Sequence, residues 1–533
     1  MRLMFIGADH EVTGSCHYLE ACNKKMVIDY GMEQGSNDYE NAELPVAPAE
    51  LDYVLLTHAH IDHSGMLPLL YAKGFRGTIL TTSATCDLCE IMLRDSAHIQ
   101  MMEAEWKNRK QRRAGREEVE PVYTMEDAEG VLKLFRPCEY GDKVELAPGL
   151  IVRYMDVGHL LGSASVEIWM TEEDVTKKIV FSGDIGNTDQ PLIRDPQYLE
   201  EADYVVMEST YGDRIHSASV PDYVEELAQL IRTTLGKGGN LVIPSFAVGR
   251  TQEMLYFLRK VKTEHILPEL EDFEVYVDSP LAIEATNVFN ENRIECFDEE
   301  AMEMVRMGIN PISFPGLKLS ISTEESKNIN FDMKPKVIIS ASGMCEAGRI
   351  RHHLKHNLWR PECTILFVGY QAQGTLGRSL LDGVDSVKLF GEVIEVDARI
   401  ERLEGISGHA DRNGLTKWVS TFQPKPKKVF VVHGEDRACE AFCQHLEDTC
   451  GLDAEAPFSG SVYDLAQGAW VKREAGIPIL KASKGRQPSS VFARLIAAGD
   501  RLRQVILRNE GGANKDLAKF ADQINSLCDK WDR

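Results

Sequence analysis

THAHIDH, residues 57–63, is the stretch of this 533-residue chain from which both its fold and its chemistry can be inferred. Three histidines and one aspartate fall within six residues, directly after the apolar run Tyr53 to Leu56. Imidazole nitrogens and carboxylate oxygens suit zinc, and a short loop can direct alternate side chains at two neighbouring ions. A solvated polar turn with chance histidines would rarely be so dense, so the stretch predicts a metal site.

Apolar runs that end abruptly in polar residues occur at four other places. They are Met26 to Ile28 before Asp29, Ile179 to Phe181 before Ser182-Gly183-Asp184, Tyr204 to Met207 before Glu208, and Val429 to Val432 before His433. Short runs rich in Val and Ile are typical of buried strands, so each polar residue is expected at a strand's carboxyl end. In α/β folds that edge of the sheet is where ligands bind. Five such runs therefore indicate one site rather than chance.

The middle of the chain, residues 211–384, alternates strand-like runs with helical patterns. The pairs are Leu241 to Ile243 with Thr251 to Val261, Phe273 to Val277 with a pattern from Leu281, Val337 to Ile339 with Ala347 to Leu358, and Ile365 to Val368 with Thr375 to Leu381. This alternation predicts βαβ units, a parallel sheet and hence a separate domain. After Gly391 the pattern returns to strands and ends at His433, so we interpret the middle block as an insertion.

The expected organisation is therefore a first domain in two parts, residues 1–210 and 385–480, with an inserted domain at 211–384 between them. Beyond residue 481 a polar stretch leads to two amphipathic helical patterns, Val491 to Leu507 and Asn514 to Trp531. These patterns predict a short helical C-terminal appendage, 481–533, whose role the sequence does not indicate.

Composition favours a soluble protein of a reducing compartment. The hydrophobic fraction of 43% and the charged fraction of 27% are those of globular proteins. No signal peptide is recognisable after Met1, and no apolar run approaches the roughly 20 residues that cross a bilayer, so we expect no membrane partner. The 12 cysteines lack the spacing of a disulfide framework. Reduced thiols are typical of the cytosol, so we expect a cytoplasmic protein.

The formal net charge of -24 argues against a nucleic-acid partner, because such partners need a positive field. Binding depends on the local field, however, and two stretches are basic. They are Arg109, Lys110, Arg112, Arg113 and Arg116, and then Arg349, Arg351, Lys355 and Arg360. The first stretch is more typical of the solvated face of a long helix.

The H-x-H-x-D-H run followed by Ser64-Gly65 resembles the signature of the metallo-β-lactamase superfamily. The chain as far as Gly434 is similar to its β-CASP branch, and within it to the prokaryotic relatives of the cleavage-and-polyadenylation endonuclease subunit. The resemblance implies an α/β fold. It would be a metallo-β-lactamase αββα sandwich with an inserted, Rossmann-like β-CASP domain built on a parallel sheet.

The resemblance also implies a site residue by residue. His58, His60 and His159 would hold one zinc ion, Asp62, His63 and His433 a second, and Asp184 would bridge them. Asp29 in Ile28-Asp29-Tyr30-Gly31 would orient the ligand loop. Glu208 matches motif A of the β-CASP branch, His409 in Ser407-Gly408-His409 matches motif B, and His433 matches motif C.

A zinc-dependent ribonuclease mechanism follows from these assignments. Two zinc ions lower the pKa of a bridging water from about 15.7 to about 7 and stabilise a phosphate in the transition state. His409 is the expected general acid for the leaving oxygen, and Glu208 would hold its ring. The family implies products with a 5′-phosphate and a 3′-hydroxyl, in RNA processing or decay. Endonuclease and 5′-exonuclease action both stay open, as does a homodimer.

The substrate, single-stranded RNA, should be gripped by the inserted domain. Three strand-to-helix turns there place backbone N–H groups where they can bind a phosphate. The candidate residues are Ser245 and Arg250 in the first turn, Ser342 and Gly343 in the second with Arg349 on the helix that follows it, and Gln373, Gly374 and Thr375 in the third.

Four alternatives were weighed against an RNA nuclease. A small-molecule hydrolase of the same fold has no obvious need for a middle domain of this size. DNA nucleases of the β-CASP family usually lack a histidine at motif C, which is His433 here. Di-iron redox relatives carry Glu where this chain has His60, and non-catalytic relatives have lost ligands. Every ligand position is filled here, which favours an enzyme.

Overall fold

A computed structural model describes residues 1–479, except 36, 115–117, 217–220, 404 and 406, together with 502, 505–506 and 514–531. The chain divides into two compact units, Met1–Ile477 and Pro478–Arg533. In the second unit α16 spans Asn514–Trp531, as its pattern predicted, whereas most of the expected helix at Val491 to Leu507 lies outside the described residues. Among the described helices, none has the length and apolarity that a membrane span requires.

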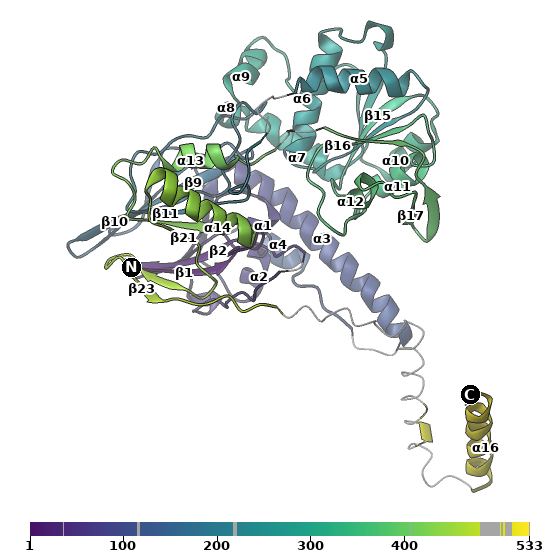
Figure 1. The fold of residues 1–533 in the computed structure, drawn as a ribbon, viewed down its shortest axis with the longest axis horizontal. Helices are drawn as coiled ribbons and strands as arrows, with labels where there is room; N and C mark the ends of the chain where they lie inside the picture. The colour runs from purple at the N-terminus through teal and green to yellow at the C-terminus, as the bar shows by residue number, and fades with distance from the viewer. Residues whose placement is uncertain are drawn as a thin grey trace. The chain divides into compact units, whose positions relative to one another are not determined.

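Two large sheets face each other in the first unit (Figure 1). The first has the strand order β23-β22-β1-β2-β3-β4-β5-β6. In that order the strands span Ala469–Lys472, Val462–Asp464, Arg2–Gly7, Cys16–Ala21, Lys24–Ile28, Tyr53–Leu55, Thr78–Thr82 and Phe135–Cys138. The second has the order β21-β20-β11-β10-β9-β8-β7. Its strands span Ala454–Glu455, Lys428–Val432, Tyr204–Glu208, Val175–Phe181, Ala164–Glu172, Leu150–Asp156 and Lys143–Ala147.

A shared apolar core joins the sheets, because one face of each sheet contributes to it. Phe5 and Leu55 of the first sheet pack in one cluster with Ile168 and Phe430 of the second. All four side chains are fully excluded from solvent. Buried and partly buried residues alternate along β8, because successive side chains of a strand point to opposite faces of the sheet.

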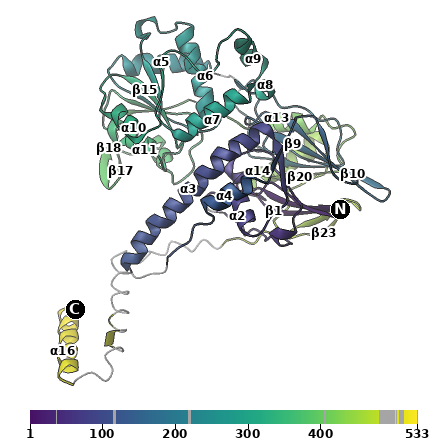
Figure 2. The same ribbon diagram turned by 180° about the vertical axis from the view of Figure 1, so that it is seen from behind.

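Helices cover both outer faces, which completes the αββα sandwich expected from the sequence (Figures 1 and 2). The first sheet carries α1 (Ile61–Ser64), α2 (Leu67–Ala72), α3 (Ser83–Ala114) and α4 (Met125–Leu132). The second carries α13 (Arg412–Val419) and α14 (Asp436–His445). Trp418 of α13 is 1% exposed and packs against Val429 of β20, so these helices form part of the core.

A third sheet, of order β14-β13-β15-β12-β16-β19, forms the centre of the inserted domain. Its strands span Leu317–Leu319, Glu274–Val277, Lys336–Ser340, Leu241–Pro244, Thr364–Phe367 and Arg399–Arg402, and all of their pairings are parallel. The helices around it are α5 (Tyr223–Leu235), α6 (Arg250–Thr263), α7 (Pro280–Glu291), α8 (Arg293–Cys296), α9 (Glu299–Arg306), α10 (Thr323–Phe331), α11 (Ile350–Asn357) and α12 (Leu376–Leu381). The predicted parallel, Rossmann-like sheet is therefore confirmed.

The end of this sheet lies later in the chain than expected. We expected the insertion to end at residue 384, yet β19 at Arg399–Arg402 pairs with β16. In sequence, a separate hairpin of β17 (Ser386–Leu389) and β18 (Glu392–Glu395) lies between β16 and β19. A short strand pattern does not specify its sheet, because pairing joins segments distant in sequence, and this made the expected end too early.

Parallel neighbours bring the polar strand ends together. β3 pairs with β4, and β11 lies between β10 and β20, all in parallel. Glu208 is the last residue of β11 and lies opposite Val432, so His433 follows directly beside it. Gly31 allows the THAHIDH loop to close against β3, because a Cβ there would lie 1.6 Å from the Asp62 carbonyl oxygen.

Candidate metal centre

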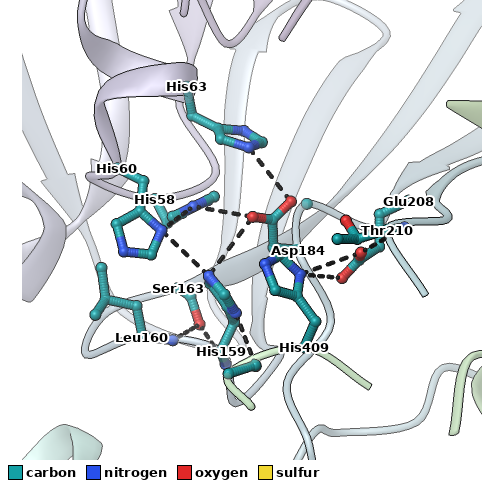
Figure 3. A network of polar contacts seen from close by, with 12 residues as sticks. His58, His60, His63, His159, Leu160, Ser163, Asp184, Glu208, Thr210 and His409 are labelled. Atoms are coloured by element: carbon teal, nitrogen blue, oxygen red, sulfur yellow. Dashed lines mark hydrogen bonds and ion pairs between the residues drawn. The ribbon is translucent and has the colours of Figure 1, made fainter. Parts of the chain in front are cut away.

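Four ligand-type atoms converge in a first cluster at this edge (Figure 3). They are Nε2 of His58, Nδ1 of His60, Nε2 of His159 and one carboxylate oxygen of Asp184. The His60 nitrogen lies 3.1 Å from that of His58 and 3.2 Å from that of His159. Asp184 Oδ2 lies 3.5 Å from each of the other two nitrogens. These four residues could hold one metal ion.

A second cluster shares Asp184 with the first. Nε2 of His63 lies 3.1 Å from Nε2 of His433 and 3.3 Å from Asp184 Oδ1. Asp62 Oδ2 approaches the His433 nitrogen to 3.6 Å. Asp62, His63 and His433 could hold a second ion, with Asp184 turned toward both clusters by its two oxygens.

The donor set fits metal ions. Zinc–nitrogen bonds of about 2.0–2.1 Å in a tetrahedron place ligand atoms roughly 3.3–3.4 Å apart, close to the spacings found here. Asp184 Oδ1 is buried and accepts no hydrogen bond from any described residue, which is costly for a carboxylate unless a cation neutralises it. The nitrogens of His58, His60 and His159 face one another, an arrangement that a cation stabilises and a hydrogen bond can satisfy only in part.

The charges of these groups suit metal binding. Burial lowers the pKa of His58 and of His159 well below the usual range, so both are neutral ligands. Burial opposes ionisation of Asp184, but His433 and its other histidine neighbours hold the pKa of that carboxyl well below its usual value. A deprotonated Asp184 beside the neutral imidazoles of His58 and His159 is the state that binds a divalent cation.

Four of these histidines are oriented by a polar contact to the ring nitrogen that does not face the clusters. Asp29 accepts from Nδ1 of His63 at 2.7 Å, and the Gly408 carbonyl oxygen lies 2.9 Å from Nδ1 of His159. The Thr57 hydroxyl lies 3.1 Å from His58 Nδ1 and donates to Asp29 at 2.9 Å. The Thr210 hydroxyl lies 3.2 Å from Nδ1 of His433. Sequence reasoning found Asp29 but missed the two threonines and Gly408, whose partners are visible only in the fold.

Asp29→Asn is expected to weaken metal binding by about 10–100-fold. The Asp29 carboxylate accepts hydrogen bonds from both His63 and Thr57, whereas an amide has only one oxygen that can accept. Asparagine tolerates the positive φ of 59° at this position, so the backbone is not strained. Competition titration with a zinc chelator measures the effect. Asp52→Asn, at the other end of the same strands, is the matched control, and equal affinities for the two variants would refute the role of Asp29.

His409 and Glu208 form a pair beside the first cluster (Figure 3). Nδ1 of His409 lies 3.1 Å and 3.2 Å from the two Glu208 oxygens, and its ring centroid lies 4.4 Å from that of His159. The Ile185 backbone N–H donates to Glu208 at 2.6 Å and fixes the carboxylate. Burial disfavours a charged imidazole, but the Glu208 carboxylate outweighs this and raises the pKa of His409 to about 9. The ring is therefore equipped to hold and release a proton.

The three candidate substrate turns of the inserted domain differ in whether their side chains are exposed or already paired within the domain. Gln373 and Gly374 are exposed, and Thr375 caps α12 by accepting from the Arg378 backbone N–H. Ser245 is buried, and the guanidinium of Arg250 pairs with Glu253. These two side chains have partners inside the domain, whereas the third turn presents polar groups outward.

The second turn, around Ser342 and Gly343, is held from two sides. The buried amide of Gln371 donates to the Gly343 carbonyl oxygen at 3.0 Å. Arg349 donates to Asp278 at 2.8 Å, so its charge is largely neutralised. It lies at the N-cap of α11 rather than within that helix, where we had placed it.

The first basic stretch behaves as a solvated helix face. Arg109 and Arg112 of α3 are exposed and pair with Glu105 and Glu118. Such surface pairs leave little free positive field for a nucleic acid. Residues 115–117 and the side chains of Lys110 and Arg113 lie outside the described part of the chain.

Comparison with protein-family models gives three matches. Residues 11–76 match the metallo-beta-lactamase superfamily, residues 251–380 match the Beta-Casp domain, and residues 393–457 match the Zn-dependent metallo-hydrolase RNA specificity domain. The three segments contain the THAHIDH loop, much of the inserted sheet, and the segment with His409 and His433.

Curated relatives match most of the chain. It is 38% identical to Ribonuclease TTHA0252 of Thermus thermophilus over 82% of this chain and 94% of that protein. It is 29% identical to Transcription termination factor FttA of Methanosarcina mazei, over 82% of this chain and 68% of that protein. The FttA protein of Methanothermobacter thermautotrophicus is 30% identical over 86% and 71%.

Proposed function

The chain belongs to the β-CASP branch of the metallo-β-lactamase superfamily, a family of metal-dependent hydrolases, and on that premise we propose that it is a ribonuclease. Its substrate is single-stranded RNA, which it cuts internally; a 5′-exonuclease mode is the second outcome that the product ladder below distinguishes. The observation that carries this proposal is Asp184, which faces two ligand clusters and lies 3.7 Å from His433, a residue of the segment that matches the RNA specificity domain.

The metal site, by this proposal, holds two zinc ions. His58, His60 and His159 would hold one, Asp62, His63 and His433 would hold the other, and Asp184 would contribute to both. Bound zinc ions supply an activated water and Lewis-acid stabilisation of the phosphate charge. Asp29 and Thr57 keep the ligand rings in place through the hydrogen bonds described above.

His409 and Glu208 perform the proton transfer. Water releases one proton to solvent and adds its oxygen to phosphorus, the bond from phosphorus to the 3′-oxygen breaks, and His409 gives its own proton to that oxygen. Glu208 stabilises the charged ring beforehand and holds its orientation. The products are a 5′-phosphate and a 3′-hydroxyl.

The inserted domain grips the RNA through its strand-to-helix turns. Gln373, Gly374 and Thr375 contact the phosphates directly, since this turn faces outward. Ser245, Arg250, Ser342, Gly343 and Arg349 shape the other two turns. The 12 free cysteines support a reducing, cytoplasmic location. The proposal does not fix the oligomeric state, and a homodimer is compatible with it.

Removal of zinc tests the assignment. Wild-type protein with about two zinc ions per chain is expected to cut 5′-labelled single-stranded RNA but not a matched DNA. Treatment with a chelator should abolish cleavage, and added zinc should restore it. Denaturing gels of the products measure both the rate and the ladder that separates internal from end-directed cutting.

The same experiment discriminates between alternatives. Cleavage of DNA alone would favour a DNA nuclease of the β-CASP family. Zinc-loaded protein that cuts neither polymer but hydrolyses a lactam or thioester would favour a small-molecule hydrolase of this fold. Unchanged RNA cleavage after verified loss of zinc would exclude the metal mechanism.

A further inference from the structure

His216 lies in the turn that follows β11, close to the proposed general acid. Both of its ring nitrogens are buried, and neither has a hydrogen-bond partner among the described residues. Its side chain as a whole is half-buried. Buried polar atoms without partners are rare in folded proteins, because burial removes their hydration and nothing replaces it. Two such atoms on one ring beside a catalytic centre are unsatisfied groups, and a turn of the half-buried ring about its Cβ–Cγ bond would bring one of them to a bound substrate.

The protein fixes His216 relative to His409. The ring of Tyr211 lies between them, with its centroid 5.2 Å from that of His216 and 5.9 Å from that of His409, edge-on in both cases. The backbone N–H of His216 donates to Asp411 at 2.9 Å, only two residues after His409. Residues 211–216 therefore form a rim of the site on the His409 side, where the leaving oxygen receives its proton.

The chemistry of His216 suits a hydroxyl group. Burial lowers the pKa of His216; Asp411 opposes this effect, and the neighbouring His409 adds to it. A neutral imidazole offers one donor and one acceptor. A phosphate oxygen can only accept, whereas a ribose hydroxyl both donates and accepts. Arg214 belongs to the same rim, where its guanidinium lies 5.3 Å from the Tyr211 ring centroid and pairs with Asp213 at 2.8 Å.

We propose that His216 binds the 2′-hydroxyl of the nucleotide whose 3′-oxygen leaves, and thereby makes cleavage selective for ribose at that position. This inference rests on the ribonuclease function proposed above. The 2′-hydroxyl is on the ribose carbon next to the leaving 3′-oxygen, so a group on the His409 rim lies on the correct side of the scissile bond. The 2′-hydroxyl is also the group by which a protein distinguishes RNA from DNA.

The test compares two proteins on two substrates. An all-ribose oligonucleotide is first used to map a cleaved bond, and a second carries one 2′-deoxy nucleotide directly 5′ of that bond. Single-turnover rates are measured for wild type and for His216→Ala. The intrinsic effect of the 2′-hydroxyl on the leaving oxygen is the same for both proteins, so it cancels in the ratio. Wild type should be slowed by the deoxy substitution about tenfold more than His216→Ala, whose all-ribose rate should fall by about the same factor.

Two further variants sharpen the result. His216→Gln keeps a donor and an acceptor and should retain part of the selectivity. His445→Ala removes another half-buried histidine, which contacts Thr416 on the far side of α13, and should behave as wild type. Equal selectivity for ribose over deoxyribose in wild type, His216→Ala and His216→Gln would overturn the inference about His216 and leave the ribonuclease function untouched. Failure of the zinc-loaded wild type to cut all-ribose RNA would overturn the ribonuclease function and this inference together.

Discussion

Asp184→Ala is expected to abolish both zinc binding and RNA cleavage, with a loss of roughly four orders of magnitude or more in rate. The reason is geometric, because its two oxygens lie 3.3 Å from His63 Nε2 and 3.5 Å from the nitrogens of His58 and His159. No other described carboxylate faces both clusters. Removing it leaves the five imidazoles of the two clusters without the negative charge that draws a cation between them. Elemental analysis and single-turnover cleavage on one preparation measure both effects.

The matched control is Asp174→Ala, which removes an exposed aspartate from the turn between β9 and β10. It should keep about two zinc ions and wild-type cleavage. Circular dichroism has to show that Asp184→Ala is folded, since loss of the sandwich would also release metal. A folded Asp184→Ala protein that retains two zinc ions would contradict the bridging assignment.

His409→Ala is expected to keep its zinc but to cleave RNA roughly two to four orders of magnitude more slowly, because the leaving oxygen loses its proton donor. The ring contacts Glu208 and lies beside His159, yet no ligand atom of either cluster belongs to it. The effect should therefore appear in the chemical step rather than in metal content. Single-turnover rates at saturating enzyme isolate that step.

An activated leaving group separates a general acid from a structural histidine. A substrate with a 3′-bridging sulfur needs no protonation at the departing atom, so His409→Ala should cut it nearly as fast as wild type does. Glu208→Gln should resemble His409→Ala on the normal substrate, since it removes the carboxylate that raises the pKa of His409 to about 9. Equal impairment of His409→Ala on both substrates would remove His409 from proton transfer.

Local sequence was sufficient for the elements and for much of the candidate site. Runs of Val and Ile predicted β3, β4, β10, β11 and β20, and the helical patterns predicted α6 at Arg250–Thr263 and α16 at Asn514–Trp531. Strand and helix periodicities are properties of neighbouring residues, so a single sequence carries them. The polar residues that end those strands were visible for the same reason, although the roles given to them came from a family resemblance.

Sheet membership was not available from local sequence. The strand pattern after Gly391 was assigned to the first domain, but β19 pairs with β16 of the inserted sheet. The charge of Arg349 was counted as available to RNA, but Asp278, far from it in sequence, takes it up. Each of these outcomes depends on a partner that is close only after folding.

The sequence by itself determined which chemical groups this protein has and at which strand ends they lie, because strands and helices form from local preferences. The tertiary structure alone decided how those groups act. It selected Nδ1 of His60 and Nε2 of His58 as the facing atoms, placed Thr210 beside His433, and left both nitrogens of His216 without a partner. Ligand geometry and hydrogen bonding extend over a few ångströms, and only the folded chain brings residues 62 and 433 within that range.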